Sequence, residues 1–271
     1  MSAKSLAILA IPRTGTNYLC DLIDKFQDIE SLYEIFHKDA VYLGNHEEFQ
    51  SKVIQQIEEQ HHLKISDFRD PSFVQFVSDR SQEFLDILAQ STECKYLSYK
   101  IFANHLSRQK LQDLIINNPA ITKIIVKRNL LDVYLSARIA QKTNQWSDGD
   151  TSQFKLEFDD RDFLKWFTNQ SKYYDFLENA LVASGQPVNI LQYETIHAHQ
   201  TNQEKFQYLF DFLRAIGVEL DANNLVDLSD KNLDRNVRKK QDKRKMTFDK
   251  ISNPSILVDT LKSHQLEFLL A

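Results

Sequence analysis

Residues 5–18 read Ser-Leu-Ala-Ile-Leu-Ala-Ile-Pro-Arg-Thr-Gly-Thr-Asn-Tyr, an apolar run followed by a short polar turn with a single glycine. The run Ser5–Ile11 is compact rather than alternating, which predicts a strand buried on both faces. From Thr16 to Phe26 the apolar residues recur on one face of a helix. A buried strand, a turn and a helix in this order are typical of the first unit of an α/β protein.

Further strands and helices alternate along the chain. Compact apolar runs predict four more strands, at Leu32–Phe36, Tyr96–Phe102, Thr122–Arg128 and Val188–Ile196. Helical patterns lie at Ser107–Asn118 with an N-cap serine, Leu130–Lys142, Asp162–Ser184 and Thr201–Ile216 with a capping box, and a last helix is expected near Ser255–His264. We therefore expect a parallel sheet of about five strands flanked by helices.

Two stretches differ from this alternation. Residues 46–91 are mostly helical in pattern with a break at Pro71, and we interpret them as a helical insertion or lid. Residues 144–160 have the composition of a polar loop. A length of 271 residues with 42% hydrophobic residues is sufficient for one large domain, and we expect residues 1–271 to form it.

Charge and cysteine content exclude some classes of protein. The net charge of −5 argues against a general nucleic-acid coat. Two cysteines, Cys20 and Cys94, have no CxxC spacing and cannot form a disulfide framework, which favours a reducing compartment. No apolar run approaches the roughly 20 residues that span a bilayer. Leu6–Ile11 is too short for a signal peptide, so we expect a cytoplasmic protein.

The turn Pro12–Tyr18 is the first candidate site. Backbone N–H groups and the helix dipole converge where a strand feeds a helix, so an anion such as a phosphate binds there readily. Gly15 permits a close approach, and Arg13, Thr14, Thr16 and Asn17 add side-chain donors. The alternative is an ordinary strand–helix turn with a good cap. A strict Walker A loop is excluded because the Gly-Lys pair is absent.

Arg128 and Ser136 form the second candidate site. Arg128 stands at the carboxyl end of a predicted strand, where open α/β sheets bind ligands, and Ser136 follows eight residues later in a helix. A guanidinium can hold a phosphate through two hydrogen bonds while a serine hydroxyl binds a third oxygen. The alternative is that Arg128 pairs with Asp132, four residues along.

Together the two stretches resemble sulfotransferases that use 3′-phosphoadenosine-5′-phosphosulfate (PAPS). The family's phosphosulfate loop is similar to Pro12-Arg13-Thr14-Gly15-Thr16-Asn17-Tyr18-Leu19, and its 3′-phosphate motif is similar to Arg128 with Ser136. The Arg13 form of the loop looks most like the bacterial carbohydrate, lipopolysaccharide and nodulation-factor branch. The resemblance covers mainly residues 5–37, 94–140 and 186–196, and it implies a P-loop-like fold.

The resemblance implies transfer of a sulfuryl group from PAPS to a hydroxyl of a small-molecule acceptor, a carbohydrate or glycolipid, without a metal. The loop Arg13–Tyr18 would hold the phosphosulfate, Arg128 and Ser136 the 3′-phosphate, and Arg13 would neutralise the leaving bridging oxygen. A base must accept the proton of the hydroxyl. Glu34, which follows the first helix, is the first candidate, with His37 and His105 as alternatives.

A basic run near the C-terminus is a further candidate. Residues 231–245 contain eight Lys and Arg with two Asp. Within the run, Arg238-Lys239-Lys240 resembles the family's C-terminal basic loop over the 3′-phosphate, although the family's Arg-Lys-Gly is not present. Such a run is also typical of solvated surface.

Other polar and aromatic groups are interpreted as structural. The pairs His61-His62 and Glu47-Glu48 lack metal-ligand spacing. The pair Tyr193-Glu194 ends a predicted strand, and the aromatic residues of 162–184 are expected in the core.

Two other functions remain open on the sequence alone. One is a P-loop-type nucleotide kinase or hydrolase, and the other is a non-catalytic module that holds RNA or an anionic membrane with the basic run. We expect no nucleic-acid partner and no membrane span.

Overall fold

A five-stranded parallel sheet forms the centre of the computed structural model, which describes residues 2–146, 150–221, 244 and 247–270. The strands are β1 (Lys4–Ala10), β2 (Ile29–Ser31), β3 (Tyr96–Phe102), β4 (Ile121–Lys127) and β5 (Ile190–Gln192), in the order β2-β3-β1-β4-β5. Every pair of neighbours is parallel. The predicted α/β class with a parallel sheet flanked by helices is confirmed.

Strand β1 lies in the middle of the sheet and is covered on both faces. Leu6 and Ile8 pack into one hydrophobic cluster, and Ala7 and Leu9 pack into another. All four side chains are fully buried. Two apolar environments explain why the segment is a continuous apolar run rather than an alternating one.

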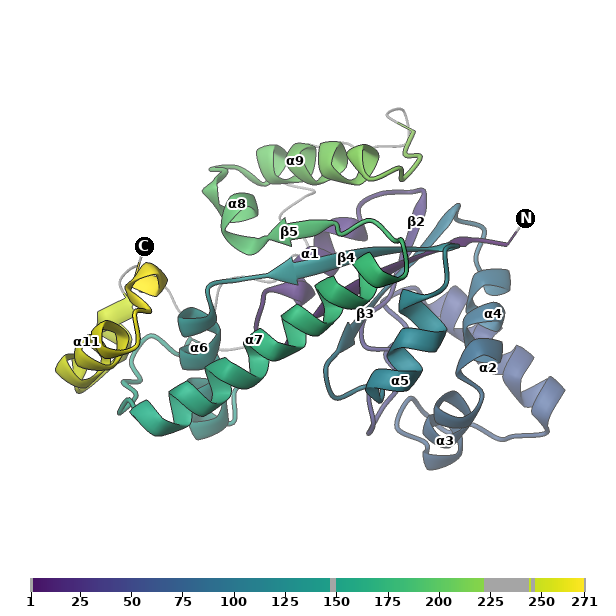
Figure 1. Ribbon diagram of the computed structural model, residues 1–271. Helices are drawn as coiled ribbons and strands as arrows, with labels where there is room; N and C mark the ends of the chain where they lie inside the picture. Colours follow the sequence, from purple (N-terminus) through teal and green to yellow (C-terminus); the bar gives the residue numbers. More distant parts are fainter. Residues whose placement is uncertain (1, 147–149, 222–243, 245–246, 271) are drawn as a thin grey trace.

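Helices cover the two faces (Figure 1). The first cluster joins β1 to α1 (Thr16–Ile23) and α9 (Asn202–Ala215). The second joins it to α7 (Asp160–Ala183), which crosses the sheet diagonally, and to the π-helical turn η1 (Gln112–Ile116) that continues α5 (Arg108–Leu111). Two predicted caps are confirmed, since Ser107 accepts from the backbone N–H of Lys110 and Thr201 forms its capping box with Glu204.

The predicted helical stretch 46–91 contains three helices on one side of the sheet: α2 (Glu47–His61), α3 (Pro71–Asp79) and α4 (Ser81–Ser91). Pro71 does not break a helix here but begins one. The side chain of Asp70 caps α3 by accepting from the backbone N–H of Ser72. Proline suits the first helical position because the N–H that proline lacks would have no partner within the helix there.

Two predicted strands have wrong boundaries. The second strand is Ile29–Ser31 rather than Leu32–Phe36, because the buried residues Leu32, Ile35 and Phe36 pack into the core from a loop. The fifth strand ends at Gln192, and Tyr193 begins α8 (Tyr193–Ala198) instead of ending a strand. Burial makes a run apolar without fixing its backbone conformation.

A third cluster lies beyond the sheet. It joins α6 (Leu130–Thr143), the start of α7, η3 (Thr247–Lys250), α11 (Pro254–Ser263) and η4 (Glu267–Leu270). Leu156, in the predicted polar loop, forms a single parallel bridge with Ile251 and fastens that loop to the C-terminal elements. No helix in the described part of the chain combines the length and the apolar character that crossing a bilayer requires.

Candidate functional site

The turn after β1 is held by its own side chains. Thr14 is fully buried, and its hydroxyl donates to the carbonyl of Ile11 at 2.8 Å. This bond closes the turn, and α1 begins at Thr16, so the first N–H groups of that helix open at the carboxyl edge of the sheet. The geometry is that of an anion site, with the positive end of the helix dipole added.

The position of Gly15 in the turn requires glycine. Its φ is +82°, in the left-handed region that favours glycine. A Cβ atom at this position would lie 2.2 Å from Cε2 of Tyr193, at the start of α8. The turn and the end of β5 are therefore in direct contact, although they are separated by most of the chain.

The two sequence motifs meet at this turn. The Nε of Arg13 donates to Oγ of Ser136 at 3.1 Å, and Nη1 of Arg128 donates to the carbonyl of Arg13 at 3.1 Å. The ring of Tyr193 lies 4.3 Å below the guanidinium of Arg128. Burial, and then the charge of Arg128, lower the pKa of Arg13. Two guanidinium groups this close favour an anion between them.

Asp132 has a different partner from the one considered above. Its Oδ1 accepts from Nζ of Lys250 at 2.8 Å, whereas Arg128 contacts the turn and Tyr193. The carboxylate of Glu194 accepts from the backbone N–H of Asn129 at 2.8 Å, which ties α8 to the start of α6. The structural interpretation of Glu194 agrees with this contact, while Tyr193 faces the candidate site.

Glu34 lies in the loop after β2, and the backbone of this loop is hydrogen-bonded to β3. The Leu32 N–H donates to the carbonyl of Ser98, and the Lys100 N–H donates to the carbonyl of Tyr33. These bonds place the Glu34 carboxylate 3.0 Å from Nζ of Lys100. The Lys100 side chain is 1% exposed, and its ammonium also donates to Oδ1 of Asn17 in α1.

His105 completes the contacts of this carboxylate. Its Nε2 lies 3.4 Å from Oε2 of Glu34. Burial raises the pKa of Glu34, but the hydrogen bond from His105 and the charge and hydrogen bond of Lys100 outweigh it and bring the value to about 2. Burial lowers the pKa of His105. At neutral pH the pair is therefore a carboxylate beside a neutral imidazole.

The tautomer of His105 follows from its second nitrogen. The backbone N–H of Phe102 donates to Nδ1 at 3.2 Å, so the proton of the neutral ring is on Nε2, which faces Glu34. The ring of His37 lies 5.6 Å from that of His105, and its Nδ1 accepts from the backbone N–H of Asp39.

One cavity of about 1180 Å³ joins these groups. The predicted site residues among its lining are Arg13, Gly15, Thr16, Asn17, Tyr18, Glu34, His37, His105, Arg128 and Ser136. Thr14 lies beneath the turn and does not line the cavity. Arg238, Lys239 and Lys240 lie outside the described residues. The carboxyl ends of all five strands lead to this cavity, which agrees with the rule for open α/β sheets.

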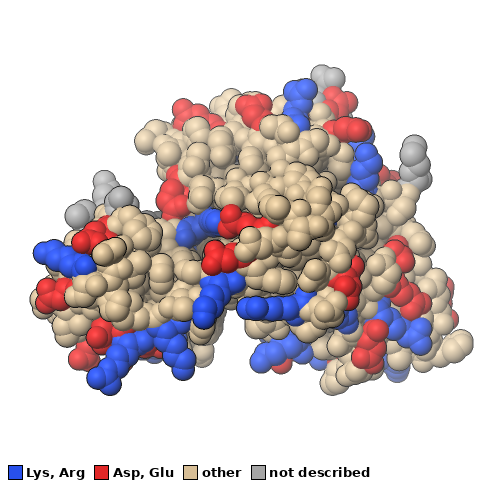
Figure 2. Space-filling model, viewed as in Figure 1, with Lys and Arg blue, Asp and Glu red and all other residues tan. Residues whose placement is uncertain are grey.

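The cavity is positively charged. Among the described residues, its lining has six Lys and Arg and two carboxylates, Glu34 and Asp132. The face of the molecule in Figure 2 has Lys and Arg interspersed with Asp and Glu instead. An excess of cations in the lining of a cavity favours an anionic ligand there.

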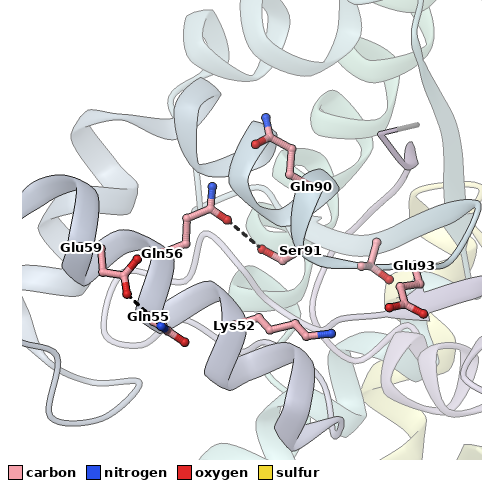
Figure 3. A pocket seen from close by; sticks show the side chains of 8 residues that line it. Lys52, Gln55, Gln56, Glu59, Gln90, Ser91 and Glu93 are labelled. Atoms are coloured by element: carbon pink, nitrogen blue, oxygen red, sulfur yellow. Dashed lines mark hydrogen bonds between the residues drawn. The ribbon is translucent and has the colours of Figure 1, made fainter.

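A second, smaller hollow of about 380 Å³ lies between α2 and the end of α4 (Figure 3). Its polar side chains bond to one another, with Ser91 donating to Gln56 and Gln55 donating to Glu59. It gathers no set of groups suited to catalysis. In the part of the chain that the structure describes, no three His, Cys, Asp or Glu side chains are grouped as a metal site requires.

Sequence reasoning missed several groups of the cavity. Lys100 lies inside a predicted strand and was not predicted as a site residue, and Tyr193 was interpreted as structural. Arg128 was selected because it stands at the carboxyl end of a buried strand, and the same criterion would have selected Tyr193, which directly follows β5. Trp146 and Lys250 line the cavity without a sequence signal of their own.

No family model matches the chain, and no curated protein matches it either. Among solved structures, it is similar to the sulfotransferase domain from the curacin biosynthetic pathway, with 15% identity, a TM-score of 0.49, and coverage of 95% of this chain and 86% of that one. It is also similar to retinol dehydratase in a complex with retinol and PAP, with 13% identity, a TM-score of 0.38, and coverage of 99% and 80%.

Proposed function

We propose that this chain is a sulfotransferase that moves a sulfuryl group from PAPS to a hydroxyl of a carbohydrate or glycolipid. One observation carries the proposal: Arg13 contacts Ser136, and Arg128 contacts the backbone of Arg13, at the edge of one cavity. Two motifs with separate phosphate-binding signals thus face the same space. A nucleotide with phosphate groups on both the 3′ and the 5′ oxygen of one ribose presents two neighbouring anions and satisfies both.

The turn Arg13–Tyr18 holds the phosphosulfate in this proposal, and Arg128 with Ser136 holds the 3′-phosphate. The Arg13 guanidinium neutralises the negative charge that develops on the bridging oxygen as adenosine 3′,5′-bisphosphate leaves. The ring of Tyr193 packs against Gly15, the guanidinium of Arg128 and the ring of His197, and so holds the turn beside the strand-end arginine.

The reaction exchanges one sulfur–oxygen bond for another and moves one proton. The acceptor oxygen bonds to sulfur while the bond between sulfur and the bridging phosphate oxygen breaks, and the hydroxyl proton moves to a base. We assign that base to Glu34. Lys100 lies between Asn17 of α1 and Glu34, so a sulfonate at the turn attracts its ammonium away from the carboxylate. Loss of this partner raises the pKa of Glu34 when the donor is bound.

His105 is a positioning residue in this scheme. Its Nδ1 is taken by the backbone N–H of Phe102, and the proton on Nε2 faces Glu34. The neutral ring therefore has no lone pair for the acceptor hydroxyl and instead orients the carboxylate. His37 lies behind it and stays an alternative base.

The remaining wall of the cavity supports a sugar-containing acceptor. Trp146 and Tyr42 line the cavity with 51% and 37% of their surfaces exposed, and the lining also contains the polar side chains of Asn104 and Lys38. Exposed aromatic faces next to hydrogen-bonding groups suit a sugar ring, which has both apolar and polar faces. The volume of the cavity leaves room for an acceptor beside the nucleotide.

Calorimetry with adenosine 3′,5′-bisphosphate, ATP with magnesium, and RNA tests the donor. We expect binding of the bisphosphate alone, and Arg128→Ala should weaken it about tenfold to a hundredfold, because a charged hydrogen-bond donor is lost. Arg161→Ala, exposed on α7 and outside the cavity, is the matched control. Magnesium-dependent binding of ATP, or tighter binding of RNA, would overturn the proposal.

A mass-spectrometric screen of sugars and glycolipids with PAPS tests the acceptor. The expected result is a gain of one sulfuryl group on a hydroxyl. Glu34→Gln should retain bisphosphate binding and lose turnover. Turnover that survives this substitution would show that Glu34 is not the base.

A further inference from the structure

The wall of the cavity contains an ion pair between two residues to which neither motif assigns a role. Nζ of Lys250, the last residue of η3, lies 2.8 Å from Oδ1 of Asp132 on α6. Both residues line the cavity. Lys250 as a whole is only 7% exposed, so most of its side chain is buried. A buried charge of this kind has a desolvation cost that one carboxylate rarely offsets in full.

The pair lies next to the Arg128–Ser136 site. Asp132 precedes Ser136 by four residues in α6, and residues four apart stack on the same face of a helix, about 5–6 Å from each other. Arg128 lies just before the same helix. The ammonium of Lys250 therefore borders the space where a phosphate on Arg128 and Ser136 would lie.

The backbone of Lys250 is fixed in this position. Its carbonyl accepts from the N–H of Leu156 at 2.8 Å, and the N–H of Ser252 donates back to Leu156 at 2.9 Å. Ile251 between them is buried in the third hydrophobic cluster. A lysine placed with this rigidity differs from a mobile surface lysine, because little side-chain freedom is left to lose on binding.

We propose that Lys250 is a further ligand of the 3′-phosphate of the donor, and that Asp132 holds its ammonium in place until the donor binds. This inference rests on the proposed function. An ammonium has three donors, and Asp132 takes one of them, so a phosphate oxygen can bind a second without displacing the carboxylate. The two cations Arg128 and Lys250 then face the two negative charges of the terminal phosphate.

A comparison of adenosine 3′,5′-bisphosphate with adenosine 5′-phosphate tests the proposal, because the second molecule lacks the 3′-phosphate. By calorimetry, Lys250→Met should weaken bisphosphate binding about tenfold to a hundredfold. It should change binding of the monophosphate by less than about twofold, since no phosphate then faces Lys250. Lys262→Met, an exposed residue of α11, should change neither affinity.

A second variant keeps the test decisive if Lys250→Met does not fold. Lys250→Gln keeps a polar side chain beside Asp132 but removes the positive charge, so it should also weaken bisphosphate binding about tenfold and change monophosphate binding by less than about twofold. An unchanged preference for the bisphosphate in Lys250→Met or in Lys250→Gln overturns the assignment of Lys250. Failure of the unmodified protein to bind the bisphosphate instead overturns the proposed function.

Discussion

Replacing Gly15 with alanine tests the contact between the turn and α8. The backbone there has a φ of +82°, which costs an alanine about 1–2 kcal/mol. The new Cβ would also lie 2.2 Å from the ring of Tyr193, and a methyl group forced into a packed site costs about 1–3 kcal/mol. We expect Gly15→Ala to lower the free energy of unfolding by about 2–5 kcal/mol.

Gly217→Ala separates the two contributions. Gly217 has a φ of +88° but no atom within 4 Å of an added Cβ, so this variant has the backbone strain without the clash. Urea denaturation should show Gly15→Ala losing about 1–3 kcal/mol more than Gly217→Ala. Tyr193→Leu combined with Gly15→Ala should recover part of that difference. Equal losses in the two glycine variants would refute the close approach of Tyr193.

Three further outcomes follow from particular residues. The pKa of Glu34 is lowered from 4.5 to about 2, so its contribution to the free energy of unfolding is fully present above pH 4.5 and is lost as the pH falls towards 2. Glu34→Gln should therefore lower the free energy of unfolding by up to about 3 kcal/mol at pH 7. Measurements of unfolding at decreasing pH should show this difference from the unmodified protein disappear. Burial lowers the pKa of Lys123 to about 8, so the free energy of unfolding should rise between pH 8 and the usual 10.5, and Lys123→Met should abolish that rise in alkaline denaturation curves. Asn129→Ala removes the acceptor of two N–H groups at the start of α6 and a hydrogen bond to the carbonyl of Leu269, and it should lower stability by about 1–2 kcal/mol in thermal unfolding.

Periodicity was sufficient to predict most of the fold. The compact run Ser5–Ile11 indicated a central strand, and β1 is indeed covered on both faces. Ser107 and Thr201 were identified as caps because each presents a hydroxyl just before an apolar helical pattern. The second strand was misplaced because a buried loop and a buried strand have the same apolar composition.

The candidate site was predicted in part. The strand–turn–helix at Gly15 and the strand-end Arg128 were visible because each lies beside a regular element with a clear pattern. Lys100 looked like any residue of a strand, and its role depends on Glu34 and Asn17, which come from other elements. Lys250 looked like one lysine among many.

The sequence by itself determined three of the five strands, most of the helices and the strand–turn–helix at Gly15, because these properties depend on neighbours within a few residues. Tertiary structure decided that Arg13 meets Ser136, that Tyr193 packs on Gly15, and that Asp132 pairs with Lys250 rather than Arg128. The reason is physical: the carboxyl ends of five parallel strands bring together residues that are far apart in the chain. Charge and packing at that edge then select the partner of each side chain.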